Sequence, residues 1–452
     1  MQLNGKNILV VGAGKTGIAT TRFLLQQGAV VTLADASTSA VVPAEFIAKN
    51  VRVKKGAHDI GTFCSQDAIV VSPGVPLTIP ALAAAREKGC EIISEIELAF
   101  RFMKTPLIAV TGTNGKTTTT SLLGEIFTAA GCEVFVGGNI GTPIIEYAAG
   151  LQNCRYVVAE ISSFQLEGIT TFRPAVSVLL NITDDHLDRY DTFDDYAQAK
   201  KRIFSNQQEN DTAVLNFDDS GVRALAGTIA AQTFMFSTRS TLDEGSYYNG
   251  TFHFRRRDSH ITIPAQAMPL TGAHNRENML AAASVGYLCG LPPDSIHRAL
   301  MSFSGLPHRM ELVAKHDHVA FYNDSKGTNV GACLKSLESL ERPIILIAGG
   351  KDKGGSYSPL REVIQKKVKL MILLGEAKKR MHKDLGDCTR TIITSSLEEA
   401  VEAAVRASEE GDCVLFSPAC SSFDMFRSYE HRGECFKELV GNMTRTGSVR
   451  IP

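Results

Sequence analysis

The stretch VTGTNGKT at residues 110–117 is the feature that most constrains how this chain can fold. Apolar residues 107–111 lead into it, and a helical pattern follows it. A glycine-rich turn between a strand and a helix is typical of a phosphate-binding loop, in which backbone N–H groups and the helix N-terminus hold phosphate oxygens. The usual first glycine would stand at position 110, where this chain has Val110. We therefore predict nucleotide binding on a shorter loop that starts at Gly112.

Two residues of this stretch carry the chemistry expected of such a loop. Lys116 would reach the terminal phosphates, and the hydroxyl of Thr117 would bind Mg²⁺. The alternative is an ordinary strand–turn–helix junction with chance glycines. The position of the motif, after a predicted strand and at the start of a predicted helix, favours the nucleotide site.

The chain has 452 residues, which is too long for one hydrophobic core. Short apolar runs separated by helical lengths recur, as at residues 7–11, 30–35 and 68–71, and this pattern is typical of parallel sheets. Residues 245–263 alternate instead and carry an Asn-Gly pair, which predicts a hairpin. We predict an α/β protein of three domains: a Rossmann-like N-terminal domain (1–104), a P-loop ATPase-type central domain with a small antiparallel sheet (105–304) and a Rossmann-like C-terminal domain (305–452).

Composition and charge exclude several classes of protein. The formal net charge of −1 provides no electrostatic attraction for nucleic acid or an anionic membrane surface. The N-terminus lacks the pattern of a signal peptide, and no apolar run approaches the ~20 residues that span a bilayer. The ten cysteines are scattered without a C-x-x-C pair, which favours reduced thiols in the cytoplasm over disulfides or zinc ligands.

A second glycine pattern lies near the N-terminus. Gly12, Gly14 and Gly17 follow the apolar run at 7–11, and Asp35 ends the next run. This spacing fits the dinucleotide-binding fingerprint. Three interpretations stay open from the residues alone: NAD, another diphosphate such as a UDP-linked substrate, or a tight turn needed only for packing.

Carboxylates follow the strands of the central segment. Glu160 ends a predicted strand, and residues 181–203 carry Asp184, Asp185, His186 and Asp188, followed by Lys200. Taken alone, this segment is typical of a solvated acidic loop and a surface helix. Because ligands collect at the carboxyl ends of strands, Glu160 and His186 become candidate magnesium ligands beside the phosphate loop.

Seven motifs together resemble the Mur ligase family, in the same order and over essentially the whole chain. They are GTNGKTTT (112–119), EISSFQLE (160–167), NITDDHLDRY (181–190), HNRENMLAA (274–282), GLPHRME (305–311), NDSKGTN (323–329) and SPACSSFDMF (417–426). The last of these, with YEHRG (429–433), is most similar to the D-glutamate-adding members.

The resemblance implies a reaction. ATP would phosphorylate the carboxylate of UDP-N-acetylmuramoyl-L-alanine, and the amine of D-glutamate would displace the phosphate, yielding an amide, ADP and phosphate for peptidoglycan precursor synthesis. It also implies two magnesium ions, a monomer in the cytoplasm, and no nucleic acid or membrane partner. The N-terminal glycines would then hold the UDP substrate, with no NAD.

The resemblance also implies roles for individual residues. The catalytic residues are Lys116, Glu160, His186 and Lys200. The metal ligands are Thr117, Glu160, His186 and Lys200, the last carrying a carbamate. ATP contacts are Gly112, Thr113, Asn114, Gly115, Lys116, Thr117, Thr118, Asn275, Asn278, Arg309 and Asp324. UDP-substrate contacts are Gly14, Lys15, Thr16, Gly17, Asp35, Gly74, Asn139 and Gln165. D-glutamate contacts are Lys326, Thr328, Lys353, Ser422 and Tyr429.

Two positions depart from the family pattern. Ala36-Ser37 stands where members can carry Thr-Arg, so the uracil contacts differ there, and Tyr429 stands where members can carry phenylalanine. Three other functions are weighed against the ligase. They are a folylpolyglutamate synthase-like enzyme, which would not need a diphosphate-binding first domain, an NAD-dependent oxidoreductase, and a nucleotide-gated binding protein without chemistry.

Overall fold

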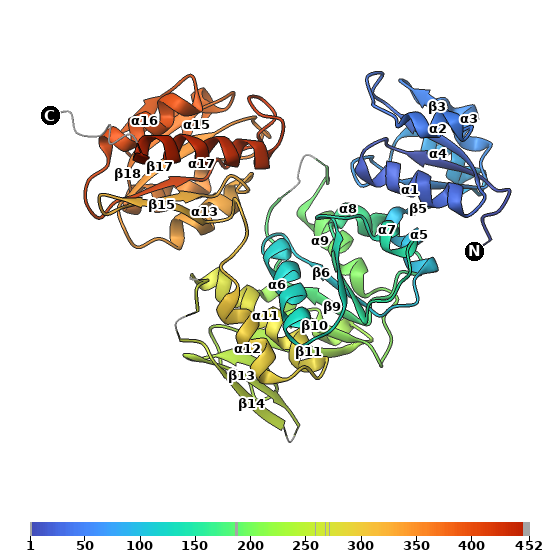
Figure 1. Cartoon of the computed structure of the whole chain (residues 1–452), viewed down its shortest axis with the longest axis horizontal. Helices are drawn as coiled ribbons and strands as arrows, with labels where there is room; N and C mark the ends of the chain where they lie inside the picture. Colours follow the sequence, from blue (N-terminus) through green and yellow to red (C-terminus); the bar gives the residue numbers. More distant parts are fainter. Residues whose placement is uncertain (1, 186–188, 258, 267, 271, 446–452) are drawn as a thin grey trace. The chain divides into compact units, whose positions relative to one another are not determined.

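The computed structural model describes residues 2–185, 189–257, 259–266, 268–270 and 272–445, so the predicted metal ligand His186 lies outside the described residues. The chain contains three sheets and divides into two compact units (Figure 1). One unit holds the first two sheets, and the other holds the third. The α/β class predicted from the sequence is confirmed.

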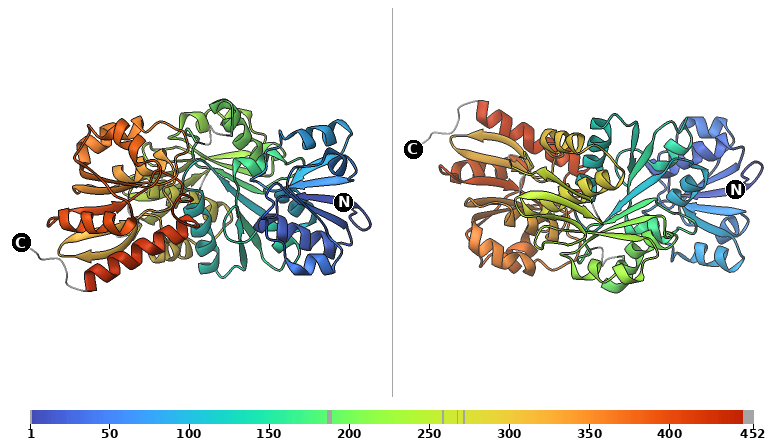
Figure 2. Two further views of the ribbon diagram at one scale, coloured as in Figure 1. Left: turned by 90° about the horizontal axis from the view of Figure 1, so that it is seen from above. Right: turned by 90° about the horizontal axis from the view of Figure 1, so that it is seen from below.

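The first sheet has five parallel strands in the order β3-β2-β1-β4-β5. Helices cover both of its faces (Figure 2). Along β1, Leu9 and Val11 pack on one face, and Ile8 and Val10 pack on the other, as the period of two in a strand requires. The elements are β1 (Asn7–Val11), α1 (Lys15–Gln26), β2 (Val30–Asp35), α2 (Ala44–Ala48), β3 (Arg52–Lys55), α3 (Ile60–Cys64), β4 (Ala68–Val71), α4 (Pro80–Glu87), β5 (Glu91–Ser94) and α5 (Glu95–Phe102).

The order of the first sheet creates a place for a ligand. The chain runs from β1 to β2 on one side and returns to β4 on the other. A crevice opens beyond the carboxyl ends of the strands at such a switch point. The helix after β1 starts at Lys15, with Gly14 as its N-cap.

The second sheet has nine strands in the order β14-β13-β12-β11-β10-β9-β6-β8-β7. The predicted hairpin is confirmed, but its antiparallel strands extend the parallel sheet rather than forming a separate one. The strands are β6 (Leu107–Thr111), β7 (Val134–Gly138), β8 (Tyr156–Glu160), β9 (Val176–Leu179), β10 (Thr212–Asn216), β11 (Gln232–Ser237), β12 (Gly245–Tyr248), β13 (Thr251–Arg256) and β14 (Ser259–Pro264). The helices are α6 (Lys116–Ala129), α7 (Ile144–Ala148), α8 (Ser163–Glu167), α9 (Phe193–Lys201), α10 (Ser220–Arg223), α11 (Ala273–Leu288) and α12 (Pro293–Ser302), with 3₁₀ turns at Arg202–Phe204 and Ala226–Thr228.

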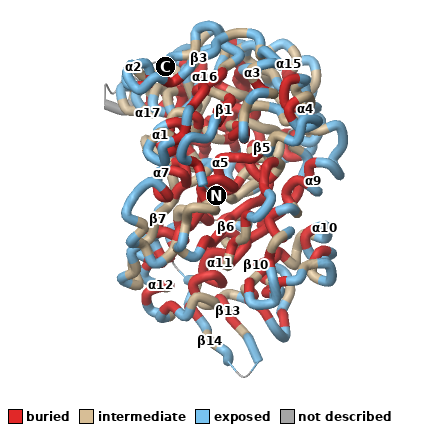
Figure 3. The backbone as a smooth tube through the Cα atoms, turned by 90° about the vertical axis from the view of Figure 1, so that its right-hand side faces the viewer, coloured by how far each residue is buried: buried red, intermediate tan, exposed pale blue. Residues whose placement is uncertain are grey.

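Strand β6 is buried along its whole length between β8 and β9, as Figure 3 shows in red. Because both faces of β6 are covered, its first four residues form an unbroken apolar run, which ends at the buried Thr111. None of the helices among the described residues combines the length and apolarity needed to cross a bilayer.

The third sheet has the order β15-β16-β20-β17-β18-β19, in which β15 pairs antiparallel with β16 and the other pairs are parallel. Two apolar clusters cover its two faces. The strands are β15 (Glu311–His316), β16 (Val319–Asn323), β17 (Ile344–Gly349), β18 (Val368–Leu374), β19 (Thr391–Ile393) and β20 (Cys413–Phe416). The helices are α13 (Val330–Glu338), α14 (Arg361–Lys367), α15 (Lys378–Leu385), α16 (Leu397–Ala407) and α17 (Tyr429–Arg445), with a 3₁₀ turn at Ser358–Leu360.

Glu97 of α5 fastens this helix to the segment that leads into β9. Its side chain has no exposed surface, and it accepts hydrogen bonds from the backbone N–H groups of Thr170, Thr171 and Phe172 at 2.8–3.0 Å. Arg101 also donates to it at 2.8 Å. Burial alone would raise the pKa of Glu97, but these hydrogen bonds outweigh it and hold the pKa at about 2.

Glu97→Gln is expected to destabilise the fold at neutral pH, because the depressed pKa shows that the folded state favours the ionised form. A pKa lowered from 4.5 to about 2 corresponds to about 3 kcal/mol at pH 7. This stability is present above pH 4.5 and is lost as the pH falls towards 2. Urea unfolding of both proteins between pH 3 and pH 8 measures the difference.

The matched control is Glu91→Gln, because Glu91 binds the same Arg101 at 2.7 Å while its side chain is 43% exposed. We expect Glu91→Gln to change the unfolding midpoint little. A deficit for Glu97→Gln that is as large at pH 3 as at pH 7 would contradict the ionised hydrogen-bonded carboxylate.

Candidate active site

The loop between β6 and α6 has the backbone of a phosphate-binding turn. Gly115 is left-handed, with φ of 87°, and serves as the N-cap of α6. A Cβ atom there would lie 2.2 Å from Oδ1 of Asn278 on α11, so glycine is required both by conformation and by this close approach. The predicted ATP contacts Gly112 to Thr118 and Asn278 therefore lie together.

Asn181 holds the loop in shape, and sequence reasoning did not assign it a role. Its backbone carbonyl accepts from Thr113 N–H at 2.9 Å, and its side-chain oxygen accepts from Asn114 N–H at 2.8 Å. Strand β9 ends at Leu179, two residues before Asn181. The available signal was that Asn181 opens the NITDDHLDRY motif.

Lys116, the first residue of α6, folds back over the loop. Its Nζ atom donates to the carbonyl oxygens of Gly112 and Thr113, both at 2.9 Å. The side chain therefore places a positive charge at the mouth of the loop, where the terminal phosphates of a bound nucleotide would carry their negative charge.

Glu160 ends β8 directly beside β6, and only 2% of it is exposed. Its Oε1 atom accepts from Asn139 Nδ2 at 2.7 Å, and its Oε2 atom has no hydrogen-bond partner among the described residues. A buried carboxylate oxygen without a partner is costly unless a cation meets it, so this donor fits Mg²⁺.

Glu160 would need other ligands to complete a magnesium site. Within the described ranges, no three His, Cys, Asp or Glu side chains gather closely enough to hold a metal ion. The other ligands predicted from the resemblance are the hydroxyl of Thr117, a carbamate on Lys200, and His186, which lies outside the described residues. Phosphate oxygens and water are further ligands that Mg²⁺ prefers.

Lys200 reaches the same loop from α9. It is 1% exposed, its Nζ atom donates to Gly112 O at 2.9 Å, and it lies 4.5 Å from the centroid of the Tyr196 ring. The Tyr196 hydroxyl donates in turn to Thr113 Oγ1 at 3.1 Å. A lysine read from sequence as part of a surface helix is thus a buried neighbour of the phosphate loop.

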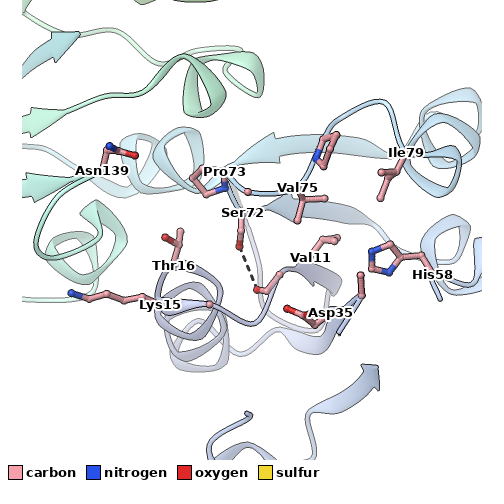
Figure 4. A pocket seen from close by; sticks show the side chains of 15 residues that line it. Val11, Lys15, Thr16, Asp35, His58, Ser72, Pro73, Val75, Ile79 and Asn139 are labelled. Carbon is pink, nitrogen blue, oxygen red and sulfur yellow. Dashed lines mark hydrogen bonds between the residues drawn. The ribbon is translucent and has the colours of Figure 1, made fainter. Parts of the chain in front are cut away.

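A cavity of about 640 Å³ opens at the carboxyl ends of β1 and β4 in the first sheet (Figure 4). Six of the predicted UDP-substrate residues line it: Gly14, Lys15, Thr16, Asp35, Gly74 and Asn139. Both carboxylate oxygens of Asp35 accept backbone hydrogen bonds, from Ala13 at 2.7 Å and from Ser37 at 2.8 Å, so Asp35 also shapes the loop after β1.

The other two predicted residues do not line this cavity. Gly17 packs α1 against the loop after β1, because a Cβ atom there would lie 1.7 Å from the carbonyl oxygen of Gly12. Gln165 closes a capping box at the start of α8, where its Oε1 atom accepts from Ser162 N–H at 2.9 Å.

Gly17→Ala is expected to lower the melting temperature by several degrees, because the loop from Gly12 to Gly17 must move to accommodate the methyl group. Gly14→Ala is the matched control, since a Cβ atom at Gly14 meets nothing within 4 Å. Thermal unfolding measures both variants, and equal melting temperatures would contradict the close approach at Gly17.

In the second compact unit, Asp324 is a buried carboxylate at the end of β16. Its Oδ2 atom accepts from the hydroxyls of Ser336 and Ser417, both at 2.7 Å. Burial raises the pKa of Asp324 to about 6, although these hydrogen bonds and the charge of Arg309 oppose the shift. Asn275, Arg309 and Asp324, three of the predicted adenosine contacts, belong to this unit.

Lys326 and Tyr429, two of the predicted D-glutamate contacts, meet in the same unit. The Nζ atom of Lys326 lies 3.8 Å from the centroid of the Tyr429 ring, and Ser325 Oγ donates to Tyr429 O at 2.9 Å. An aromatic face holds a cation by its quadrupole, so the ring limits where the ammonium can point.

Arg432 of α17 organises the surrounding loops and was not identified from sequence. Its fully buried guanidinium donates to Ser325 O and Oγ, to Ser421 O and to Cys420 O at 2.9–3.2 Å. Burial lowers its pKa to about 10, so it remains charged at neutral pH. The available signal was its place in the YEHRG motif.

The remaining D-glutamate candidates lie on these loops. Ser422 is buried just after Ser421, whose backbone exchanges two hydrogen bonds with that of Lys351. Lys353 is exposed two residues further along that second loop. Thr328 N–H donates to Lys326 O at 2.8 Å. The candidates therefore lie on three loops, at residues 325–328, 351–353 and 420–422. Hydrogen bonds from Arg432 and the backbone pairing of Lys351 with Ser421 connect these loops.

Comparisons with known proteins show the family to which the chain belongs. Three family models match the chain: Mur ligase MurD-like, N-terminal domain at residues 6–94, Mur ligase middle domain at 110–286, and Mur ligase, glutamate ligase domain at 308–420. A relative from Geobacter metallireducens, named UDP-N-acetylmuramoylalanine--D-glutamate ligase, is 51% identical over 451 residues, covering 99% of each chain. A relative of the same name from Citrifermentans bemidjiense is 51% identical over 444 residues, covering 97% of this chain and 98% of its own.

Two solved structures share the fold. A pseudomurein peptide ligase type C from Methanothermus fervidus has a TM-score of 0.62 at 19% identity, covering 97% of this chain and 100% of its own. A MurF ligase from Thermotoga maritima in complex with ADP has a TM-score of 0.62 at 17% identity, covering 99% of this chain and 97% of its own.

The three sheets and the strand–loop–helix phosphate site define an α/β enzyme that acts on a nucleotide. The chain belongs to the Mur ligase family, which confirms the family predicted from its motifs. It is therefore an ATP-dependent ligase that forms an amide bond.

Proposed function

We propose that this ligase joins D-glutamate to UDP-N-acetylmuramoyl-L-alanine, releasing ADP and phosphate, in the synthesis of peptidoglycan precursors. The observation that carries the proposal is the 51% identity, over 99% of both chains, to a relative whose name states this substrate and amino acid. The proposed domains are residues 1–104 for the UDP substrate, 105–304 for ATP and 305–452 for the amino acid.

The phosphate loop would bind ATP and prepare it for transfer. Backbone N–H groups at the start of α6 would bind the phosphates. The ammonium of Lys116 would stay close to the γ-phosphoryl group while it moves from ATP to the substrate. Two magnesium ions, held by Glu160, Thr117, His186 and a carbamate on Lys200, would neutralise phosphate charge when bound. The unpartnered Oε2 atom of Glu160 supports a cation at this place.

The reaction needs an activated acyl group because a carboxylate is a poor electrophile. The L-alanine carboxylate would attack the γ-phosphate of ATP, forming an acyl phosphate and releasing ADP. The neutral amine of D-glutamate would then attack the acyl carbon, and phosphate would leave as the amide forms. Lys116 stabilises the negative charge that develops during both steps.

The loops around Arg432 would hold D-glutamate. Its two carboxylates require cations and hydroxyl donors, which Lys326, Lys353, Thr328 and Ser422 offer. Tyr429 restrains Lys326 through its ring. We further propose that the enzyme works in the cytoplasm as a monomer, because one chain supplies all the predicted contacts.

The test is ADP release by the full chain with ATP and Mg²⁺. Turnover is expected only when UDP-N-acetylmuramoyl-L-alanine and D-glutamate are both present. L-Glutamate and D-alanine should give little turnover, because the loops around Lys326 are proposed to recognise one dicarboxylate configuration. ADP release that does not depend on which amino acid is present, or turnover with a folate acceptor, would overturn the proposal.

A further inference from the structure

The cavity of the first sheet has one end suited to phosphate. Helix α1 begins at Lys15 after the N-cap Gly14, which provides no side-chain cap, and Gly14, Lys15 and Thr16 all line the cavity, so the first N–H groups of the helix are available there. A 12-residue helix attracts an anion at such an N-terminus. The diphosphate of a UDP-linked substrate would therefore lie towards this end of the cavity, over the start of α1.

The direction of the substrate follows from Asn139. In Figure 4, Asn139, Lys15 and Thr16 lie at one end of the cavity, and His58, Ile79 and Asp35 lie at the other. Asn139 hydrogen-bonds Glu160, which stands beside the phosphate loop of β6. Because the acyl group of the substrate must reach ATP, the acyl half would extend out of the cavity past Asn139. The nucleoside half would then occupy the other end, at His58.

The end at His58 has the features of a flat binding site for a base. Among the described residues that line the cavity, His58 is the only one with an aromatic side chain. Its ring rests on the buried ring of Phe63, with centroids 5.2 Å apart. Val75 and Ile79 supply apolar walls beside it.

Other groups near this end offer no flat surface to the face of a base. Ala36 carries only a methyl group, and the hydroxyl of Ser37 is hydrogen-bonded to that of Ser39 at 2.9 Å. Each oxygen of Asp35 accepts one backbone N–H group and can accept one more hydrogen bond from the edge of a base, but it cannot stack on its face. Among the described residues that line the cavity, the imidazole of His58 is therefore the side chain that can stack on the face of a base.

We propose that His58 is a substrate-binding residue for the nucleoside half of the substrate, stacking on the pyrimidine base while Phe63 holds its ring in place. This inference rests on the proposed function, because it assumes that the diphosphate in the cavity belongs to a uridine nucleotide. An aromatic face binds any base by stacking, so the preference for a pyrimidine would come from the apolar walls that limit its size.

The test is calorimetric binding of UDP and of pyrophosphate to the full chain without ATP or amino acid. His58→Ala should weaken UDP binding by about tenfold, the loss of one stacked base, and leave pyrophosphate binding unchanged. His58→Phe should keep most of the affinity for UDP. Ile60→Ala is the matched control, because Ile60 is a half-exposed neighbour outside the cavity lining.

The outcomes separate the two proposals. If the wild-type chain binds UDP and His58→Ala binds it equally well, the inference is overturned and the proposed function stands. Equal loss of UDP and pyrophosphate would also overturn it, because His58 would then act on the fold or on the diphosphate. If the wild-type chain binds no uridine nucleotide, the proposed function fails first. In turnover, His58→Ala should raise KM for the UDP substrate alone.

Discussion

Lys116→Ala is expected to reduce kcat by about a thousandfold, the range seen when one preorganised donor to a developing negative charge is removed. Its ammonium lies over the loop, bonded to Gly112 O and Thr113 O, so it needs no rearrangement to meet the phosphate. Single-turnover formation of ADP measures the phosphoryl-transfer step directly.

The fold should survive this change, because α6 packs through buried residues further along the helix, such as Leu123 and Phe127. UDP binding to the first sheet is the internal control and should match the wild type. Turnover of Lys116→Ala within threefold of the wild type would mean that the transferred phosphate does not lie over this loop.

Lys200→Ala is expected to lose most activity, by about a hundredfold or more, and to recover part of it with formate or acetate. A carbamate on this buried lysine would replace a cation with an anion at the metal site, and a short carboxylate can occupy the space left by alanine. The Nζ atom of Lys200 lies beside Gly112 O, so a carbamate formed on it would lie at the phosphate loop, where a magnesium ion needs an anionic ligand.

A second measurement does not depend on activity. Wild-type protein exchanged into ¹³C-bicarbonate should show a carbamate carbon signal by NMR, and Lys200→Ala should lack it. Lys201→Ala is the matched control, since Lys201 is the next residue of α9 and is only partly buried. Loss of activity without rescue, together with an unchanged carbamate signal, would place the modification on another lysine.

Several features could be predicted from the sequence because they are local. The loop at 112–117 is a run of consecutive residues, and the apolar strand before it, the left-handed glycine and the helix after it all agree with one structure. The strands at 7–11, 30–35, 68–71 and 107–111 have the predicted bounds, because strands covered on both faces are short and mostly apolar.

Other features depend on residues far apart in the chain and could not be predicted. Asn181 shapes a loop almost 70 positions earlier, and Arg432 binds carbonyls near residue 325. Their sequence neighbours give no sign of these partners. The edge hairpin likewise was predicted from its Asn-Gly turn, but its addition to the parallel sheet depends on the pairing of β11 with β12.

The sequence by itself determined the α/β class, the phosphate loop and the family, because these rest on short contiguous patterns whose residue types have few structural alternatives. Only the tertiary structure decided that Lys200 is buried against Gly112, that one oxygen of Glu160 has no hydrogen-bond partner among the described residues, and that His58 lines the same cavity as Lys15. The physical reason is that burial and charge pairing are properties of packed neighbours, and packing brings together residues that the sequence keeps apart.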